Sequence, residues 1–81
     1  MRNELEKEIE KWEGKLDKKL SVAEEVDDDG RWILENARAY RKDSEHFFEE
    51  GDLIQSFESL VWAWAFVEIG ENLDHIRNKK G

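Results

Sequence analysis

The sequence predicts an all-α protein, an antiparallel up-down-up bundle of three helices. Three observations favour this fold class: the 81-residue chain contains no proline, its apolar residues recur at helical spacing, and the pattern is clearly broken at only two places. The β-branched residues are scattered among helix formers, so nothing favours strands. A chain of this length is expected to form a single domain over residues 1–81 with a small core.

The first helix is predicted over about residues 2–26. Its apolar residues form one narrow stripe on a charged helix, which needs a single partner face. They are Leu5, Ile9, Trp12, Leu16, Leu20 and Ala23. Asp27, Asp28 and Asp29 then end this helix, because carboxylates oppose the dipole at a helix C-terminus and favour the next N-terminus. Since this segment lacks the ligand spacing of an EF-hand, we interpret it as a cap and not as a calcium loop.

The second helix is predicted over about residues 28–50 and the third over about residues 53–77. Gly51 suits the left-handed position that follows a helix, and Asp52 with Gln55 forms an N-terminal capping box for the next one. The two helices therefore form a tight hairpin. The third helix is extended to about residue 77 because its apolar spacing continues through Leu73 and Ile76.

The third helix is apolar on two sides. Trp62 and Trp64 are two residues apart, so a helix directs their indoles to nearly opposite sides. The face of Trp64 is assigned to the core, where it meets the second helix. Small residues form a seam between the two faces, where another backbone can approach closely. They are Ser56, Ser59, Ala63 and Gly70.

The face of Trp62 exceeds what one small core needs. It consists of Trp62, Phe66, Ile69, Leu73 and Ile76. Exposed, these side chains would present apolar area on the order of 500 Å², which is at the limit for a soluble monomer. Either another chain covers this face or the first helix wraps over it. We favour another chain, and we expect a symmetric homodimer or a contact with another helical protein.

Composition limits the partners and the location of the protein. The net charge of −8 opposes contact with a polyphosphate, so nucleic acid is not an expected partner. Arg77, Lys79 and Lys80 are interpreted as cations that complete the end of the third helix. The chain lacks cysteine, an apolar leader and an apolar run of membrane-spanning length. We therefore expect a cytoplasmic protein without membrane contact, cofactor or metal site.

Two acids are candidates for chemistry. Asp43 lies on the flank of the second helix and Glu68 borders the Trp64 face of the third, so they could approach each other across the hairpin as an acid/base or metal-binding pair. Interhelical hydrogen bonding explains the same two acids, and we favour that structural interpretation. His46 and His75 lie on different helices and lack the spacing of a zinc site.

A second candidate is a spacing match. Arg41 and His46 are similar to the Arg-x4-His motif of the HEPN ribonuclease superfamily, and this resemblance implies a ribonuclease that needs no metal. In a continuous helix, however, the two side chains point about 140° apart and do not converge. The acidic charge of the chain also opposes RNA.

One set of residues spans the second and third helices: Tyr40, Asp43, Phe47, Gly51, Asp52 and Ala63. With these residues the segment 28–70 resembles the archaeal domain-of-unknown-function family 357. Ser44 and Ser56 stand where alanine is usual, and Glu68 stands at the place of an aspartate. Trp62 stands where tyrosine is usual. The resemblance implies a small up-down-up bundle, and because these residues mostly serve packing and turns, it implies no activity.

The sequence therefore favours an uncharacterised, non-catalytic interaction or assembly module that self-associates through its third helix. Two alternatives stay open. One is the HEPN-like ribonuclease with Arg41 and His46. The other is a monomeric bundle that binds a small apolar ligand in a cavity lined by tryptophan, with Trp12, Trp32 and Trp64 as candidates.

Overall fold

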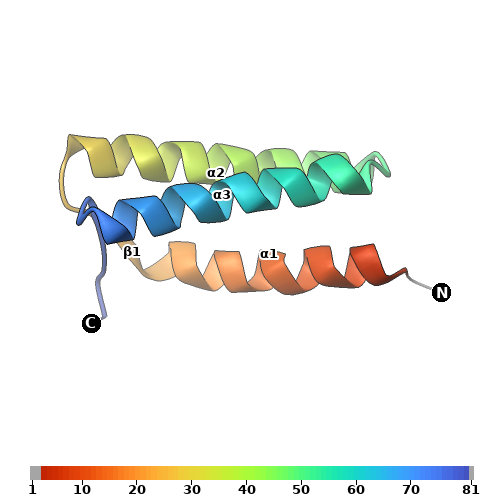
Figure 1. The fold of residues 1–81 in the computed structure, drawn as a ribbon, viewed down its shortest axis with the longest axis horizontal. Helices are drawn as coiled ribbons and strands as arrows, with labels where there is room; N and C mark the ends of the chain where they lie inside the picture. Colours follow the sequence, from red (N-terminus) through yellow and green to blue (C-terminus); the bar gives the residue numbers. More distant parts are fainter. Residues whose placement is uncertain (1–2, 81) are drawn as a thin grey trace.

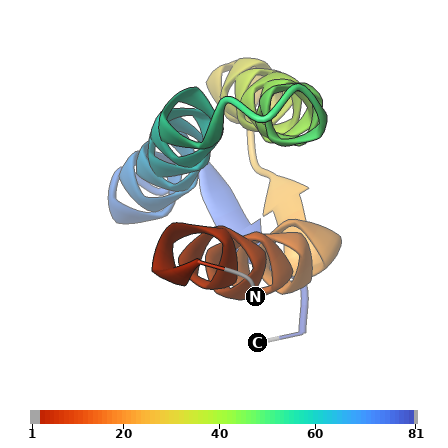
Figure 2. The same ribbon diagram turned by 90° about the vertical axis from the view of Figure 1, so that its right-hand side faces the viewer.

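The computed structural model describes residues 3–80 and confirms the bundle of three helices (Figure 1). These are α1 (Glu4–Val22), α2 (Asp28–Glu49) and α3 (Leu53–Asn72). They run up, down and up along a molecule of 43 × 21 × 16 Å and stand at the corners of a triangle in end view (Figure 2). No helix of the described residues is long and apolar enough to cross a membrane.

The hairpin between α2 and α3 forms as the sequence predicts. Asp27 caps α2 by accepting a hydrogen bond from the amide of Gly30 at 2.8 Å, which confirms that the acidic segment is a cap. Gly51 adopts the left-handed conformation, with φ at 82°. Asp52 then caps α3, because its carboxylate accepts hydrogen bonds from the amide and the side chain of Gln55 at 3.2 and 3.0 Å.

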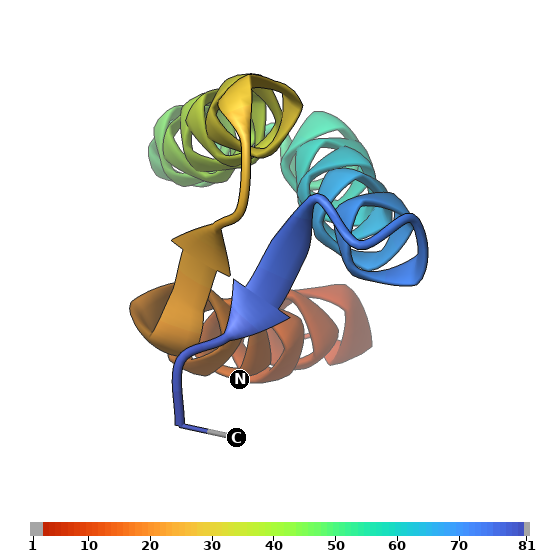
Figure 3. The same ribbon diagram turned by 90° about the vertical axis from the view of Figure 1, so that its left-hand side faces the viewer.

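The first helix is shorter than predicted. α1 ends at Val22 and not near residue 26, and the next residues form the strand β1 (Ala23–Glu25). This strand pairs antiparallel with β2 (Ile76–Asn78), with Glu24 opposite Arg77, at one end of the bundle (Figure 3). The prediction is wrong here because the partner strand lies more than fifty residues away in the sequence, where no local pattern marks it.

The third helix is also shorter than predicted. α3 ends at Asn72 and not near residue 77. Asp74 adopts the left-handed conformation, with φ at 63°, and the amide of His75 donates to the carbonyl of Gly70 at 2.8 Å. This is the Schellman turn that commonly ends helices, with aspartate in place of the usual glycine. The basic residues that follow, Arg77, Lys79 and Lys80, therefore lie beyond α3.

Ile76 does not lie on the exposed face of the third helix, as the sequence spacing predicts. It belongs to β2 and is only 3% exposed. A β-carbon on Gly70 would lie 2.5 Å from the tip of the Ile76 side chain, so glycine leaves the space that Ile76 fills. Because the Schellman turn reverses the chain, Ile76 packs back into the core and is removed from any outer surface.

The core follows the small-residue seam of α3. The buried residues of α3 recur at alternating spacings of four and three positions, as in a coiled coil. Five of the six follow this spacing, Ser56, Leu60, Ala63, Val67 and Gly70, and Ser59 is the sixth. The buried apolar side chains of α1 and α2 complete the core: Ile9, Leu16 and Leu20, with Ile33, Leu34 and Ala37. Trp62 and Trp64 therefore flank the core on opposite sides, and neither is its centre.

Candidate functional site

A row of aromatic side chains covers one side of the α2–α3 hairpin. Tyr40 of α2 stacks on Trp62 and Phe66 of α3, with ring centroids 6.3 and 5.7 Å apart. Trp32, which lies about two turns earlier on α2, meets Phe66 edge-on at 5.7 Å. We call these four residues the aromatic face. The rings contact one another in sequence, so they form one continuous surface.

Much of the aromatic face is exposed to solvent. Trp32 and Trp62 are each 58% exposed. Ile69 and Leu73 continue the same side of α3 and are 53% and 62% exposed. Together these side chains present apolar area on the order of 500 Å², about the size of the largest patch on an ordinary monomer.

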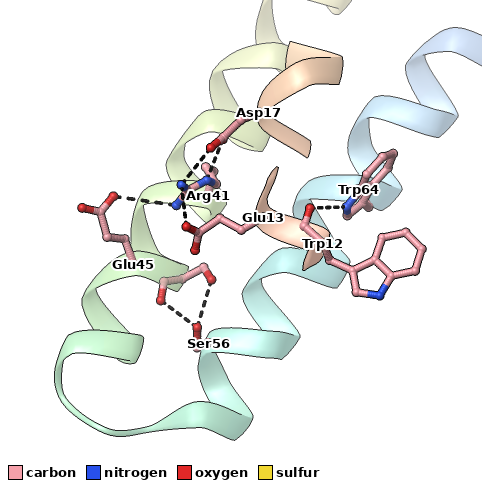
Figure 4. Close-up of polar contacts among 8 residues, drawn as sticks. Trp12, Glu13, Asp17, Arg41, Glu45, Ser56 and Trp64 are labelled. Atoms are coloured by element: carbon pink, nitrogen blue, oxygen red, sulfur yellow. Dashed lines mark hydrogen bonds and ion pairs between the residues drawn. The ribbon is translucent and has the colours of Figure 1, made fainter. Parts of the chain in front are cut away.

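The helices that neighbour Trp62 and Trp64 differ from those predicted, because the sequence predicts that Trp64 lies against the second helix. Trp64 packs against α1, where its ring is perpendicular to that of Trp12 at 5.8 Å and its indole N–H donates to the Trp12 carbonyl at 3.4 Å (Figure 4). The side of Trp62 faces α2 through Tyr40. Helical spacing defines the two faces correctly, but it does not say which neighbour lies on each. α1 covers the Trp64 side, and α2 covers part of the Trp62 side.

A pocket opens between α1 and α3 on the Trp64 side. It has a volume of about 410 Å³, within the range of about 300–1,000 Å³ that is typical of small-molecule sites. It is lined by Trp12, Phe57, Leu60, Val61, Trp64, Ala65 and Glu68. Glu68 is the charged member of this otherwise apolar set.

Arg41 ties α1 to α2 (Figure 4). Its guanidinium lies 2.8 Å from a carboxylate oxygen of Asp17 and 3.2 Å from one of Glu13, both on α1, and 3.7 Å from one of Glu45. The hydrogen bond with Asp17, supported by the charges of Glu13 and Glu45, raises the pKa of Arg41 above its ordinary value. Arg41 is therefore a charged clamp between two helices.

Arg41 and His46 do not converge. Both lie on the uninterrupted helix α2, five residues apart, so their side chains point about 140° apart. Arg41 is turned toward the carboxylates of α1, which would repel a phosphodiester, whereas His46 is exposed. The geometry gives the ribonuclease hypothesis no support.

Asp43 and Glu68 also lie apart. The hydroxyls of Ser44 and Ser56 are 3.1 Å apart and set the register of the hairpin, so Asp43 is level with the start of α3. Glu68 lies twelve residues beyond Ser56, about 18 Å along the helix. Among residues 3–80, no group of three or more histidine or acidic side chains is placed to hold a metal ion.

The other family-motif residues build turns and packing. Phe47 is half-buried, and its carbonyl accepts the amide of Asp52 at 2.9 Å across the hairpin turn. Ala63 is fully buried where α3 faces the other helices. Tyr40 is the motif residue that belongs to the aromatic face.

Of the three tryptophans that the sequence offers as cavity residues, Trp12 and Trp64 line the pocket, whereas Trp32 lies on the aromatic face. The sequence does not single out the rest of the pocket. Phe57 and Val61 lie on the Trp64 face, which helical spacing assigns to the core, yet Val61 is 51% exposed. The sequence feature that could have indicated this pocket is one helical row, in which an acid follows three apolar residues: Phe57, Val61, Trp64 and Glu68.

The fold and the motif residues define a small antiparallel three-helix protein whose matching positions serve turns and packing. The chain belongs to the family of proteins of unknown function DUF357, whose model matches residues 3–76. The crystal structure of protein AF1782 from Archaeoglobus fulgidus is similar, with a TM-score of 0.84 and 35% identity over 93% of each chain. None of the curated protein sequences matches the chain. The predicted family is therefore confirmed, and the match extends through α1.

Proposed function

We propose that this protein is a non-catalytic interaction module that forms a symmetric homodimer through the aromatic face. The observation that carries the proposal is the continuous row of four rings in which Trp32 and Trp62 are each 58% exposed. Large aromatic side chains are enriched among the residues that contribute most to protein–protein binding. Ile69 and Leu73 extend this surface along α3.

The size of the surface suits a small dimer interface. A standard interface buries about 800 Å² on each partner. The aromatic face with Ile69 and Leu73 supplies on the order of 500 Å² of apolar area before any polar rim is added. In a two-fold contact the same patch is used on both copies, so the α3 helix of one copy would pack against the equivalent helix of the other.

The negative charge of the chain makes the stability of the proposed dimer depend on salt concentration. Each copy carries a net charge of −8, so two copies repel each other at low ionic strength. Added salt screens this repulsion while the apolar contact persists. The dissociation constant of the dimer is therefore expected to fall as sodium chloride is raised.

Sedimentation velocity over a range of concentrations tests the proposal with two matched variants. Trp62→Glu introduces a charge into the aromatic face, and Ile54→Glu introduces the same charge at a 68% exposed position of α3 outside that face. We expect dimers for the unmodified chain and for Ile54→Glu, and monomers for Trp62→Glu. Thermal unfolding is the control for folding, because an exposed tryptophan should cost less than the about 3–5 kcal/mol of a buried one.

Two results would contradict the proposal. One is a monomer at high micromolar concentration of the unmodified chain, including at raised salt. The other is equal dimerisation of Trp62→Glu and Ile54→Glu, which would place the interface elsewhere.

A further inference from the structure

We infer that the pocket between α1 and α3 is a binding site for a hydrophobic organic cation, with an aromatic or aliphatic body and an ammonium head. The pocket lies on the Trp64 side of α3, opposite the side of Trp62. The inference therefore does not depend on the proposed dimer.

The walls of the pocket offer aromatic surface and few polar atoms. Trp12 and Trp64 stand perpendicular, with an interplanar angle of 89°, and lie next to each other away from Arg41 (Figure 4). Phe57 adds a third ring. These three rings offer apolar contact area to the body of an organic ligand, and the face of an aromatic ring attracts rather than repels a nearby cation.

The protein itself uses the polar atoms of both indoles. The indole N–H of Trp12 donates to Glu8 at 3.1 Å, and that of Trp64 donates to the Trp12 carbonyl at 3.4 Å. Neither N–H is then available to a ligand that needs a hydrogen-bond donor. The tryptophans therefore favour a ligand that contacts carbon surface and ring faces over an anionic or strongly accepting one.

Glu68 supplies the charge that selects a cation. It lines the pocket, and within residues 3–80 its carboxylate has no hydrogen bond or ion pair. Two other acids near α1 are paired with cations: Glu13 with Arg41, and Glu71 with Lys19 at 2.9 Å. An unpaired carboxylate beside aromatic rings complements an ammonium head in both charge and shape.

Two lysines beside Trp12 make that end of the pocket unfavourable for the cationic head of a ligand. The ammonium of Lys15 lies 4.6 Å from the centroid of a Trp12 ring, and that of Lys11 lies 5.8 Å from it. The surroundings of Trp12 are therefore already cationic. Because these two ammonium groups repel another cation at Trp12, the ligand head is assigned to the end near Glu68 and the apolar body to the rings.

Nuclear magnetic resonance of the four indole N–H groups tests the inference directly. The probe is benzyltrimethylammonium, which has an aromatic body and a quaternary head, titrated into the full chain at constant ionic strength. We expect saturable shifts of the Trp12 and Trp64 signals, while those of Trp32 and Trp62 stay unchanged. Phenylmethanesulfonate, an anion of similar size, should produce no saturable shift.

Two variants of equal charge change provide the control. Glu68→Gln removes the pocket carboxylate and is expected to weaken binding at least fivefold. Glu58→Gln changes another exposed acid of α3 that does not line the pocket, and it is expected to bind as the unmodified chain does. Both positions are exposed, so neither change should prevent folding.

The inference would be overturned if there were no saturable shift, if the sulfonate bound equally well, or if Glu58→Gln and Glu68→Gln weakened binding equally. Equal shifts of all four indoles would also overturn it, because they indicate binding without a defined site. None of these results bears on the dimer, which sedimentation tests separately.

Discussion

At the scale of single residues, a hydrogen-bonded pair of buried serines connects α2 to α3. Ser44 and Ser56 are both fully buried, their hydroxyls are 3.1 Å apart, and the Ser56 hydroxyl donates to the Ser44 carbonyl at 2.8 Å. Since Ser56 has one hydroxyl proton, Ser44 must be the donor between the two hydroxyls. Each group is thereby satisfied, which is why two polar side chains are stable in this core.

The serine pair predicts unequal effects of alanine. Ser56→Ala leaves the Ser44 hydroxyl buried without its acceptor, so we expect a loss of about 1–2 kcal/mol in the free energy of unfolding. Ser44→Ala combined with Ser56→Ala leaves no unpaired hydroxyl and should cost less than Ser56→Ala alone. Guanidinium unfolding followed by tryptophan fluorescence measures both values. Losses that simply add in the double variant would contradict this account.

At the scale of elements, three side-chain and backbone groups fasten the end of the bundle. Asp27 accepts from the Gly30 amide with one oxygen and lies 2.7 Å from Nδ1 of His75 with the other. The His75 carbonyl accepts the amide of Val26 at 2.9 Å. A β-carbon on Gly30 would overlap that carbonyl, so glycine permits the close approach of the two segments. We call Asp27, Gly30 and His75 the end latch.

The end latch predicts a stability that depends on pH. The hydrogen bond with Asp27 raises the pKa of His75 above 6.5, so its contribution is complete below that value and is lost as the pH rises through the raised pKa. Hydrogen bonds, first from Gly30 and then from His75, lower the pKa of Asp27 below 3.8, so its contribution is lost as the pH falls through the lowered pKa. The latch should therefore contribute most between these two values.

A comparison of the unmodified chain with His75→Gln measures this contribution. The difference in their free energies of unfolding is expected to be largest near pH 5, between the ordinary values of 3.8 and 6.5, and to shrink at alkaline pH. A difference that stays constant from acid to alkaline pH would rule out the proposed pairing.

At the scale of the whole molecule, α3 is the central apolar element. α1 covers its Trp64 side and α2 covers part of its Trp62 side, and each arrangement leaves apolar surface open. A helix that is apolar all round is normally buried. The aromatic face and the pocket therefore have one origin, which is that two neighbouring helices are too few to enclose α3.

The attachment of α1 provides a prediction at the same scale. α2 and α3 share the most extensive contact, whereas α1 meets α2 mainly through Arg41. Arg41→Gln leaves the carboxylates of Glu13 and Asp17 without their cation, so we expect a loss of about 1–2 kcal/mol. Hydrogen exchange should accelerate in α1 and change little in α2 and α3.

Arg31→Gln is the matched control for Arg41→Gln. Arg31 pairs with Glu25 at 3.0 Å, but the two side chains are 61% and 43% exposed, so this change should lower stability far less than Arg41→Gln does. Equal effects of the two variants, or acceleration of exchange in all three helices after Arg41→Gln, would show that α1 is not held by the clamp.

Local interactions explain the parts of the molecule that the sequence determined by itself. Helical spacing defines the three helices, Asp27 marks the start of α2, and Gly51 and Asp52 mark the hairpin turn between α2 and α3. These signals depend on neighbours within about four residues, so they can be recognised in the chain alone. The exposed side of Trp62 follows from the same spacing, since one small core cannot enclose both sides of an apolar helix.

The tertiary structure alone decided the contacts between distant segments. The pairing of β1 with β2 joins residues more than fifty positions apart, and it draws Ile76 into the core after the unexpected left-handed turn at Asp74. Which helix faces Trp64, and hence the pocket with Glu68, depends on the side of the hairpin against which α1 packs. Spacing along one helix carries no information on that choice, because it defines the faces of a helix but not the neighbours that occupy them.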